Sequence, residues 1–343
     1  MQIWWVYPVI ASFLLAVVLT DVFGMLARGL GVVDRPNGGK KQHAAPTPLL
    51  GGLGIFVAVN LVVFCVLFLS DHFTAGEITN RHFLGLFLGA LILMIGGALD
   101  DVYDLPPYKT VWFPIVAALV AVCFGLGVEK VTNPLGGAFM IPAFVSDVVT
   151  FLWLLCLMYT TKLLDGLDGL ATGISALGVG MIALLALSVA YFQPDVALLA
   201  LIVLAALVGF LLWNAHPAQI FLGEGGSTLV GFLVGALAVI SGGKFATALL
   251  VLGIPALDVM FVMVGRWRLG KPIFAAGDRT HLHHRLMALG LTQRQVVALY
   301  YAIALIFGIT TLFFESWQKL IALIALFILM LLFALILPKP RTV

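Results

Sequence analysis

Long apolar runs, separated by short polar connections, dominate this chain. A run of about twenty apolar residues is long enough to cross the hydrocarbon core of a bilayer as an α-helix. We expect eleven spans, at 3–27, 48–70, 83–99, 110–127, 144–161, 169–190, 196–213, 227–241, 245–265, 296–314 and 317–337. Two of them, 83–99 and 227–241, are short and need neighbouring residues to cross. No repeat or linker divides the chain, so the pattern predicts a single all-α, polytopic membrane domain over residues 1–343.

Composition supports this class. The chain is 62% apolar and only 10% charged, which is too little charge to cover the surface of a soluble domain of 343 residues. Cys65, Cys123 and Cys156 lie inside apolar segments without metal-ligand spacing, so we interpret them as small apolar residues. The net charge of +2 gives no indication of nucleic-acid binding.

The basic residues are distributed unequally between the two sides of the predicted bundle. The odd-numbered connections and the C-terminal tail carry fourteen of the eighteen: Arg28, Arg35, Lys40, Lys41, Lys109, Lys162, Arg266, Arg268, Lys271, Arg279, Arg285, Arg294, Lys339 and Arg341. The positive-inside rule then places the N-terminus outside and the C-terminus in the cytoplasm of a cell whose inner (plasma) membrane holds the protein. The clustered acids and histidines share that cytoplasmic side, which favours chemistry on a charged, soluble substrate.

Acidic residues cluster at two cytoplasmic boundaries. The segment GGALDDVYDL contains Asp100, Asp101 and Asp104, of which the first and last would share one face of a helix. Such a cluster is costly unless a cation compensates it, although a solvated acidic loop is the plainer alternative. The segment TTKLLDGLDGLATG places Asp165 and Asp168 three residues apart, one turn after Lys162. An interfacial ion pair between Lys162 and Asp165 is the alternative to a functional site there.

A glycine-rich turn, FLGEGGSTLVG, surrounds Glu224. Glycines let backbone N–H groups approach an anion at a helix N-terminus, and a carboxylate in the turn could hold Mg²⁺. Membrane helices also use glycine for close contacts, which is the competing interpretation.

The polar segment GDRTHLHHRLMALG carries Arg279 and the three histidines His281, His283 and His284. The histidines could suggest Zn²⁺, but on a helix His281 and His284 would face one way and His283 another. We favour contacts to phosphate or sugar, with Arg279 supplying paired hydrogen bonds.

Three further positions carry polar chemistry near or inside the membrane. The first connection carries Lys40 and His43 before a Pro- and Gly-rich stretch, more than a positive-inside loop requires. Asp21 and Asp258 are intramembrane acids that could be buried hydrogen-bonding groups, the preferred interpretation for Asp21.

The order of these motifs resembles one family. The patterns DRPN…KKxHxxPxPxxGG, GALDDxxDL, DGLDGLxxG, the glycine turn, IPxxD and HxHH follow one another from about Asp34 to His284. The chain is similar to the polyprenyl-phosphate N-acetylhexosamine-1-phosphate transferases of glycosyltransferase family 4. These include phospho-N-acetylmuramoyl-pentapeptide transferase and undecaprenyl-phosphate GlcNAc-1-phosphate transferase. The HxHH form resembles the branch that initiates O-antigen, teichoic acid and similar cell-envelope glycans.

The resemblance implies a reaction in which a UDP-N-acetylhexosamine, by default UDP-GlcNAc, and a polyprenyl phosphate give a polyprenyl-diphospho-sugar and UMP. It implies Mg²⁺, with Mn²⁺ as an alternative, and leaves a homodimer open. It gives catalytic positions to Asp100, Asp101, Asp165 and Asp168, and metal contacts to Glu224 and Asp165. The substrate-binding positions implied are Lys40, His43, Lys162, Arg279, His281, His283 and His284.

Two residues depart from the family pattern. The acid of the glycine turn is usually Asp, and here it is Glu224; an Asn usually stands where this chain has Lys162. In relatives that Asn helps to bind the metal, which a protonated lysine cannot do. Our hypothesis is that the changes compensate, with Glu224 reaching the metal and Lys162 contacting phosphate.

Two other functions compete. The DDVYD spacing also occurs in intramembrane prenyltransferases, but these need a second Asp-rich motif, which DGLDG does not supply. A transporter would place its polar residues near the bilayer midplane, often with repeats, whereas the polar residues of this chain cluster at one face.

Overall fold

The computed structural model describes residues 3–35, 46–70, 73, 76, 78–128, 130–133, 137–189, 191–268, 270 and 281–336. Lys40, His43 and Arg279 therefore lie outside the described residues. About 80% of the structure is helical, as expected for an all-α membrane protein.

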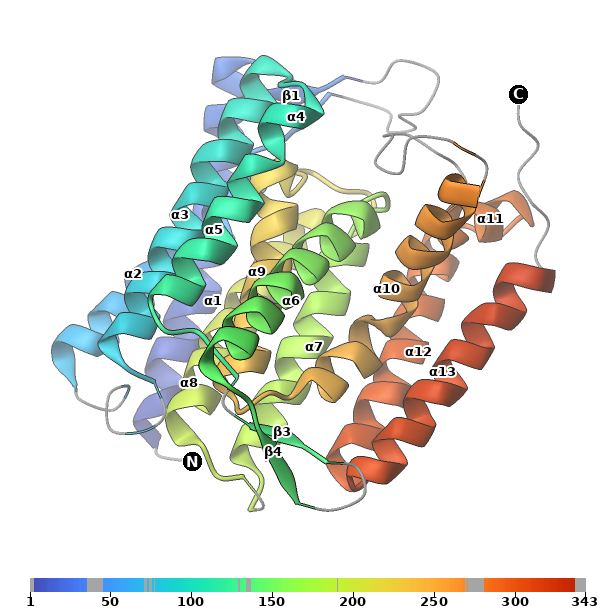
Figure 1. Cartoon of the computed structure of the whole chain (residues 1–343). Helices are drawn as coiled ribbons and strands as arrows, with labels where there is room; N and C mark the ends of the chain where they lie inside the picture. The colour runs from blue at the N-terminus through green and yellow to red at the C-terminus, as the bar shows by residue number, and fades with distance from the viewer. Residues whose placement is uncertain are drawn as a thin grey trace.

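Helices are the main elements of the described chain (Figure 1). They are the 3₁₀-helix η1 (Ile3–Trp5), α1 (Val6–Leu30), α2 (Gly51–Leu69), α3 (Asn80–Tyr103), α4 (Pro107–Thr110), α5 (Trp112–Cys123), α6 (Ala143–Leu164), α7 (Leu170–Leu187), α8 (Pro194–Asn214), α9 (Gly223–Ile240), α10 (Phe245–Arg268), α11 (Leu282–Ala288), α12 (Gln293–Phe313) and α13 (Ser316–Ile336). Two small antiparallel ribbons complete the described part, β1 (Val33–Asp34) with β2 (Thr47–Pro48) and β3 (Lys130–Thr132) with β4 (Ala138–Met140).

Each of the eleven expected spans corresponds to a helix, and among the described residues ten of these are long and apolar enough to cross a membrane. The exception is α5, whose 12 residues reach only about 18 Å. The spans expected to be short are longer than predicted, because polar residues at their ends join the helices: α3 has 24 residues and α9 has 18. The number of crossings stays a prediction.

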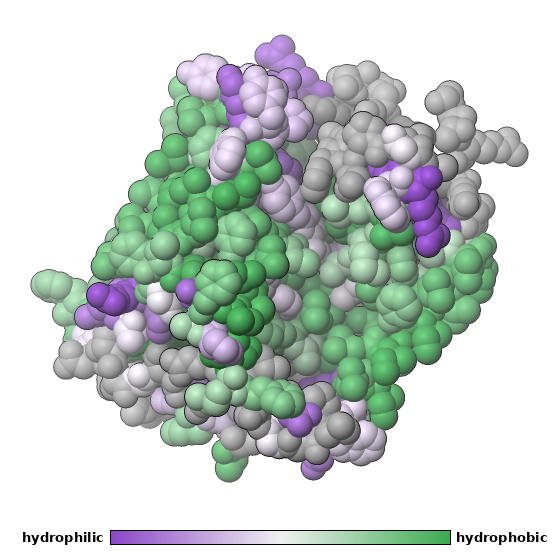
Figure 2. Space-filling model, in the orientation of Figure 1, coloured by the Kyte–Doolittle hydropathy of each residue, from purple (hydrophilic) through white to green (hydrophobic). Residues whose placement is uncertain are grey.

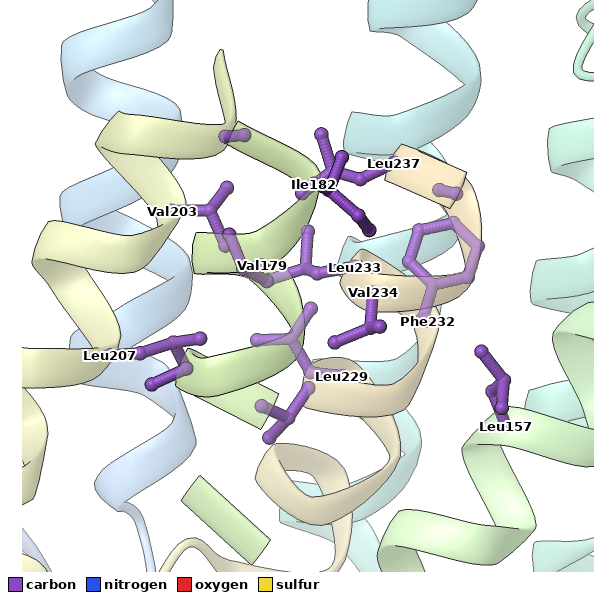
Figure 3. Close-up of a cluster of buried hydrophobic side chains, with 14 of the residues drawn as sticks. Leu157, Val179, Ile182, Val203, Leu207, Leu229, Phe232, Leu233, Val234 and Leu237 are labelled. Carbon is purple, nitrogen blue, oxygen red and sulfur yellow. The ribbon is translucent and has the colours of Figure 1, made fainter. Parts of the chain in front are cut away.

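The helices α7 and α9 form the centre of the bundle. Within α9, 89% of the apolar window is buried, compared with 17% in the peripheral α13. Figure 3 shows Val179 of α7 and Val203 of α8 meeting Leu233 of α9, with Leu157 of α6 on the other side. Because α9 is enclosed on all sides, its first turn, which carries Glu224, is held in a fixed position.

A bend in α10 shapes one face of the molecule. Pro255 lies inside this helix, where it removes a backbone hydrogen bond and clashes with the preceding turn, and α10 changes direction in Figure 1. Figure 2 shows apolar side chains over the middle of this face and a hollow between α10 and the elements on its left.

Candidate active site

The end of α3 meets the start of α9 through an acid and a glycine. The carboxylate oxygens of Asp101 accept a hydrogen bond from the backbone N–H of Glu224, at 3.2 and 3.3 Å. A Cβ atom added to Gly97 would lie 2.0 Å from the nitrogen of Gly225, so the two backbones touch. A carboxylate is stabilised at a helix N-terminus, where N–H groups lack partners. The acid beside the glycine turn is therefore Asp101 itself.

Asp100 and Asp104 do not share a helical face, which corrects the sequence interpretation. The helix α3 ends at Tyr103, and Asp104 is its left-handed C-cap with φ of 49°. Asp100 accepts a hydrogen bond at 2.9 Å from the N–H of Leu105, which precedes Pro106. The residue before a proline disfavours helix, so the chain turns here and Asp100 closes the turn.

Lys162 forms an ion pair with Glu224. Lys162 lies in the last turn of α6 and Glu224 in the first turn of α9, and their side chains are 27% and 23% exposed. The sequence alternative gave Lys162 a different partner, Asp165. Asp165 is the C-cap of α6, and its N–H still bonds to the carbonyl of Thr161 at 3.1 Å. The ion pair that the structure shows for Lys162 is the one with Glu224. The pair brings two motifs together at one end of the bundle.

Asp165 lies next to this pair. Burial, and then the negative charges of Glu224 and Asp168, raise the pKa of Asp165 from 3.8 to about 7. This carboxyl therefore changes its charge near neutral pH, which suits a group that holds or releases a proton during a reaction.

Asp168 has a partner that our sequence analysis missed, His216. The Oδ2 atom of Asp168 accepts hydrogen bonds from His216 Nδ1 at 2.7 Å and from the N–H of Ala218 at 3.1 Å. The carbonyl of His216 in turn accepts one from Arg294 on α12 at 3.3 Å. The signal for His216 was its place in the short polar connection that leads to Glu224.

The histidine motif begins at a buried acid. Asp258 accepts hydrogen bonds from His281 Nδ1 at 2.9 Å and from the N–H of Leu282 at 2.8 Å. His281 precedes α11 with an extended ψ of 146°, so it does not follow the helical spacing that we expected. Its ring stacks on that of His283, with centroids 5.7 Å apart and planes 8° apart. Asp258 is thus a buried hydrogen-bonding group, which is one of the roles that its place inside a span allowed.

His283 connects the histidine motif to the two aspartates after α6. A Cβ atom on Gly166 would lie 2.9 Å from His283 Nε2, so α11 packs over the turn between Asp165 and Asp168. Burial, and then the neighbouring His284 and His281, hold the pKa of His283 well below its usual value. His283 is therefore neutral at physiological pH.

The structure thus brings together six of the positions singled out in the sequence, and Lys40, His43 and Arg279 lie outside the described residues. The six are Asp101, Lys162, Asp165, Asp168, Glu224 and His283. Asp100 is close enough to Glu224 and Lys162 to interact with both electrostatically. The cluster is half-exposed and holds several acids around the ammonium of Lys162. Such a cluster can bind a polyanion through the ammonium, or can bind a cation that is itself coordinated by a polyanion.

Whether a divalent cation fits can be judged from the donor set. Of the two expected ligands, Glu224 already pairs with the ammonium of Lys162, and Asp165 is a carboxyl whose pKa burial raises to about 7. Asp101 holds the first turn of α9. Within the described ranges, no group of three or more His, Cys, Asp or Glu side chains is arranged to hold a metal ion. The arrangement at Glu224 therefore does not fit a divalent ion as it stands.

Comparison with known proteins gives a consistent set of relatives. The family model described as glycosyl transferase family 4 matches residues 83–242. A probable undecaprenyl-phosphate N-acetylglucosaminyl 1-phosphate transferase of Bacillus subtilis (strain 168) is 32% identical over 94% of this chain and 88% of its own length. A decaprenyl-phosphate N-acetylglucosaminephosphotransferase of Mycobacterium tuberculosis (strain H37Rv) is 30% identical over 81% of this chain and 74% of its own length. A phospho-N-acetylmuramoyl-pentapeptide-transferase of Halalkalibacterium halodurans is 30% identical over 90% of this chain and 96% of its own length.

Proposed function

The chain belongs to glycosyl transferase family 4, and from this premise we propose that it transfers N-acetylhexosamine 1-phosphate from a UDP-sugar to undecaprenyl phosphate. It is an enzyme of the polyprenyl-phosphate sugar phosphotransferase type. The proposed products are a polyprenyl-diphospho-sugar and UMP, and GlcNAc is the proposed sugar. The reaction would be the first membrane step of a cell-envelope glycan.

One observation carries the proposal: Lys162, Glu224, Asp101 and Asp165 converge from three helices at one end of an apolar bundle. The reaction joins a charged, soluble donor to a lipid, so it needs a polar site beside an apolar surface. The hollow in Figure 2 begins near that polar end and continues between apolar walls. We assign the lipid tail to this hollow and the two phosphate groups to the cluster above it.

Each described residue receives a role from its surroundings. Asp100 orients or deprotonates the lipid phosphate at the end of α3. Asp168, held by His216, lies on the nucleotide side. The stacked histidines contact the sugar and its phosphate, because they lie against the same turn. Lys40, His43 and Arg279 are proposed to bind substrate as well.

The setting follows from the charge distribution. We propose a plasma-membrane protein with its active site on the cytoplasmic face, where UDP-sugars are made available in solution. The resemblance also implies Mg²⁺, with Mn²⁺ as an alternative. Because the described donors do not fit that ion at Glu224, no step is assigned to it.

The test is a transfer assay on the purified protein in detergent. Undecaprenyl phosphate and a panel of UDP-sugars would be supplied, and UMP and the lipid product would be quantified. We expect product with one N-acetylhexosamine donor, and loss by about 10²–10³-fold in Asp165→Asn, as for the removal of a group that contacts reacting charge. Asp147→Asn, at an exposed acid near the other end of α6, should keep the wild-type rate. A folded protein that forms neither UMP nor lipid product with any donor would contradict the proposal.

A further inference from the structure

Lys162 and Glu224, the two residues at which this chain departs from its family's pattern, contact each other directly. They belong to α6 and α9, which are separated in sequence by α7 and α8. Two departures that meet in space as an ion pair point to one joint change in the site.

The contact between α6 and α9 fixes the distance that this pair spans. A Cβ atom on Gly231 would lie 2.3 Å from Thr161 Oγ1 and 2.4 Å from the carbonyl oxygen of Leu157, so at Gly231 the backbone of α9 touches both a side chain and the backbone of α6. Trp153 Nε1 donates a hydrogen bond to the carbonyl of Gly235 at 3.1 Å one turn further on. Since Thr161 precedes Lys162, the positions of both charged residues follow from a rigid helix contact. Shorter Asn and Asp side chains on the same backbones would leave open the space that the ammonium now fills.

The ammonium of Lys162 lies where a cation in this site would lie. Glu224 interacts electrostatically with Asp100, Asp101 and Asp165, and Lys162 interacts with Asp100. An ammonium has three donors, of which Glu224 uses one, and the side chain is 27% exposed. It can therefore hold Glu224 and contact a phosphate at the same time.

We propose that the ammonium of Lys162 takes the place of the divalent cation in this enzyme and contacts the phosphate groups of the donor directly. The proposal rests on the function proposed above. An oxygen of the lipid phosphate forms a bond to the phosphorus that carries the sugar, and the bond from that phosphorus to the bridging oxygen breaks. UMP leaves with the electron pair on that oxygen. Lys162 keeps its proton and stabilises the charge on the leaving phosphate.

The experiment measures metal binding and metal dependence separately. Protein freed of metal with EDTA would be titrated with Mn²⁺ and followed by electron paramagnetic resonance. Transfer would be assayed with EDTA or with Mg²⁺. The variants are Lys162→Asn, Lys162→Arg, Glu224→Gln and the double variant Lys162→Asn with Glu224→Asp, and Lys319→Asn on α13 is the control. All would first be checked by size-exclusion chromatography and thermal unfolding.

We expect wild-type transfer to be the same in EDTA and in Mg²⁺, and the protein to bind no Mn²⁺ tightly. Lys162→Asn should lose about 10²–10³-fold in EDTA, as for loss of a donor to developing charge, while Lys162→Arg keeps EDTA-insensitive transfer. The double variant should bind Mn²⁺ about tenfold tighter than wild type or more, and should need a metal for transfer.

Two results would overturn the inference: a tight Mn²⁺ site in the wild type that Glu224→Gln removes, or wild-type transfer that EDTA abolishes and Mg²⁺ restores. The wild-type measurements stand alone if the double variant does not fold. The Mn²⁺ titration needs no turnover. A wild type without activity would therefore defeat the proposed function, while the titration would still decide the role of Lys162.

Discussion

At the scale of single residues, Asp258 shows how one buried carboxylate positions a whole motif. It lies one turn after Pro255 in α10 and accepts hydrogen bonds from both His281 and Leu282. These two bonds fix where α11 begins. Since His283 packs against Gly166, they also fix the distance between the histidines and the turn that carries Asp165. Asp258 therefore acts on the site through its neighbours.

We predict that Asp258→Ala destabilises the protein by about 1–3 kcal/mol, because it leaves buried donors without an acceptor. Transfer activity should fall as well, because the histidines lose their fixed position. Thermal unfolding in detergent and the transfer assay measure the two effects. Asp147→Ala, at an exposed site, should change stability by no more than about 0.5 kcal/mol. Equal effects of the two substitutions would show that Asp258 has no positioning role.

The raised pKa of Asp165 predicts a dependence of stability on pH. Because its pKa is about 7 in the folded protein and 3.8 is its ordinary value, the folded state holds a proton that the unfolded state releases between these values. Stability should therefore be highest below about pH 4 as far as this group is concerned, and should fall as the pH rises to about 7. Asp165→Asn removes the titration, so its Tm should fall less than that of wild type between pH 5 and pH 7.5.

The matched variant for this measurement is Asp147→Asn, which removes an exposed carboxyl from the same helix. It should keep the wild-type pH profile. If Asp165→Asn and the wild type had parallel profiles, the burial of Asp165 would not be coupled to folding.

At the scale of elements, the contact of α3 with α9 joins packing to the site. The missing side chain at Gly97 lets the two backbones touch, and the touch brings Asp101 onto the first turn of α9. Small residues at helix contacts serve this purpose in membranes, where apolar burial does not drive helices together.

Gly97→Ala should therefore separate the end of α3 from α9. We expect a loss of about 1–3 kcal/mol of stability from overpacking, and lower transfer activity because Asp101 leaves the N–H of Glu224. The matched control is Gly29→Ala in α1, where an added Cβ would meet nothing within 4 Å. That substitution should be neutral, or stabilising by up to about 1 kcal/mol. A thermal unfolding series in detergent compares them, and similar Tm values for both would refute the packing argument.

Sequence patterns predicted the elements better than they predicted the partners. The apolar runs gave a helix for every expected span, because hydrophobicity and length determine spans locally. The sequence did not predict where helices end when a turn sets the boundary. At Asp104 the chain leaves α3 ahead of the Pro106–Pro107 pair. The Lys162–Glu224 and Asp168–His216 contacts join distant segments, so only tertiary packing could select them.

At the scale of the whole molecule, the two ends of the bundle differ. In Figure 1 the last turns of α3 and α6, the first turn of α9 and the helix α11 lie at one end, the acid end, and the β3–β4 ribbon lies at the other. The helix α1 begins at the ribbon end and α13 finishes at the acid end (Figure 1). Together with the basic residues of the acid end, this arrangement predicts that the acid end faces the cytoplasm.

Two residues that flank α12 test this orientation. Leu289, before the helix, and Glu315, after it, are both exposed and lie at opposite ends. In a background without Cys65, Cys123 and Cys156, an impermeant maleimide should label Glu315→Cys in intact cells and leave Leu289→Cys unlabelled. Inverted vesicles should give the reverse. Labelling of Leu289→Cys in intact cells would contradict this orientation and would place the acid end outside the cell.

The hydrogen bond between Asp101 and Glu224 also has a consequence for the synthesis and membrane insertion of the protein. As the ribosome extends the chain, Asp101 emerges more than a hundred residues before the helix turn that it caps. Until α9 enters the membrane, α3 can pack against α2 and α5, and Asp101 lacks the N–H group of Glu224 to which it bonds in the complete fold. The reaction centre cannot exist on any nascent chain that ends before Glu224, and it is completed only when α11 brings His283 against Gly166.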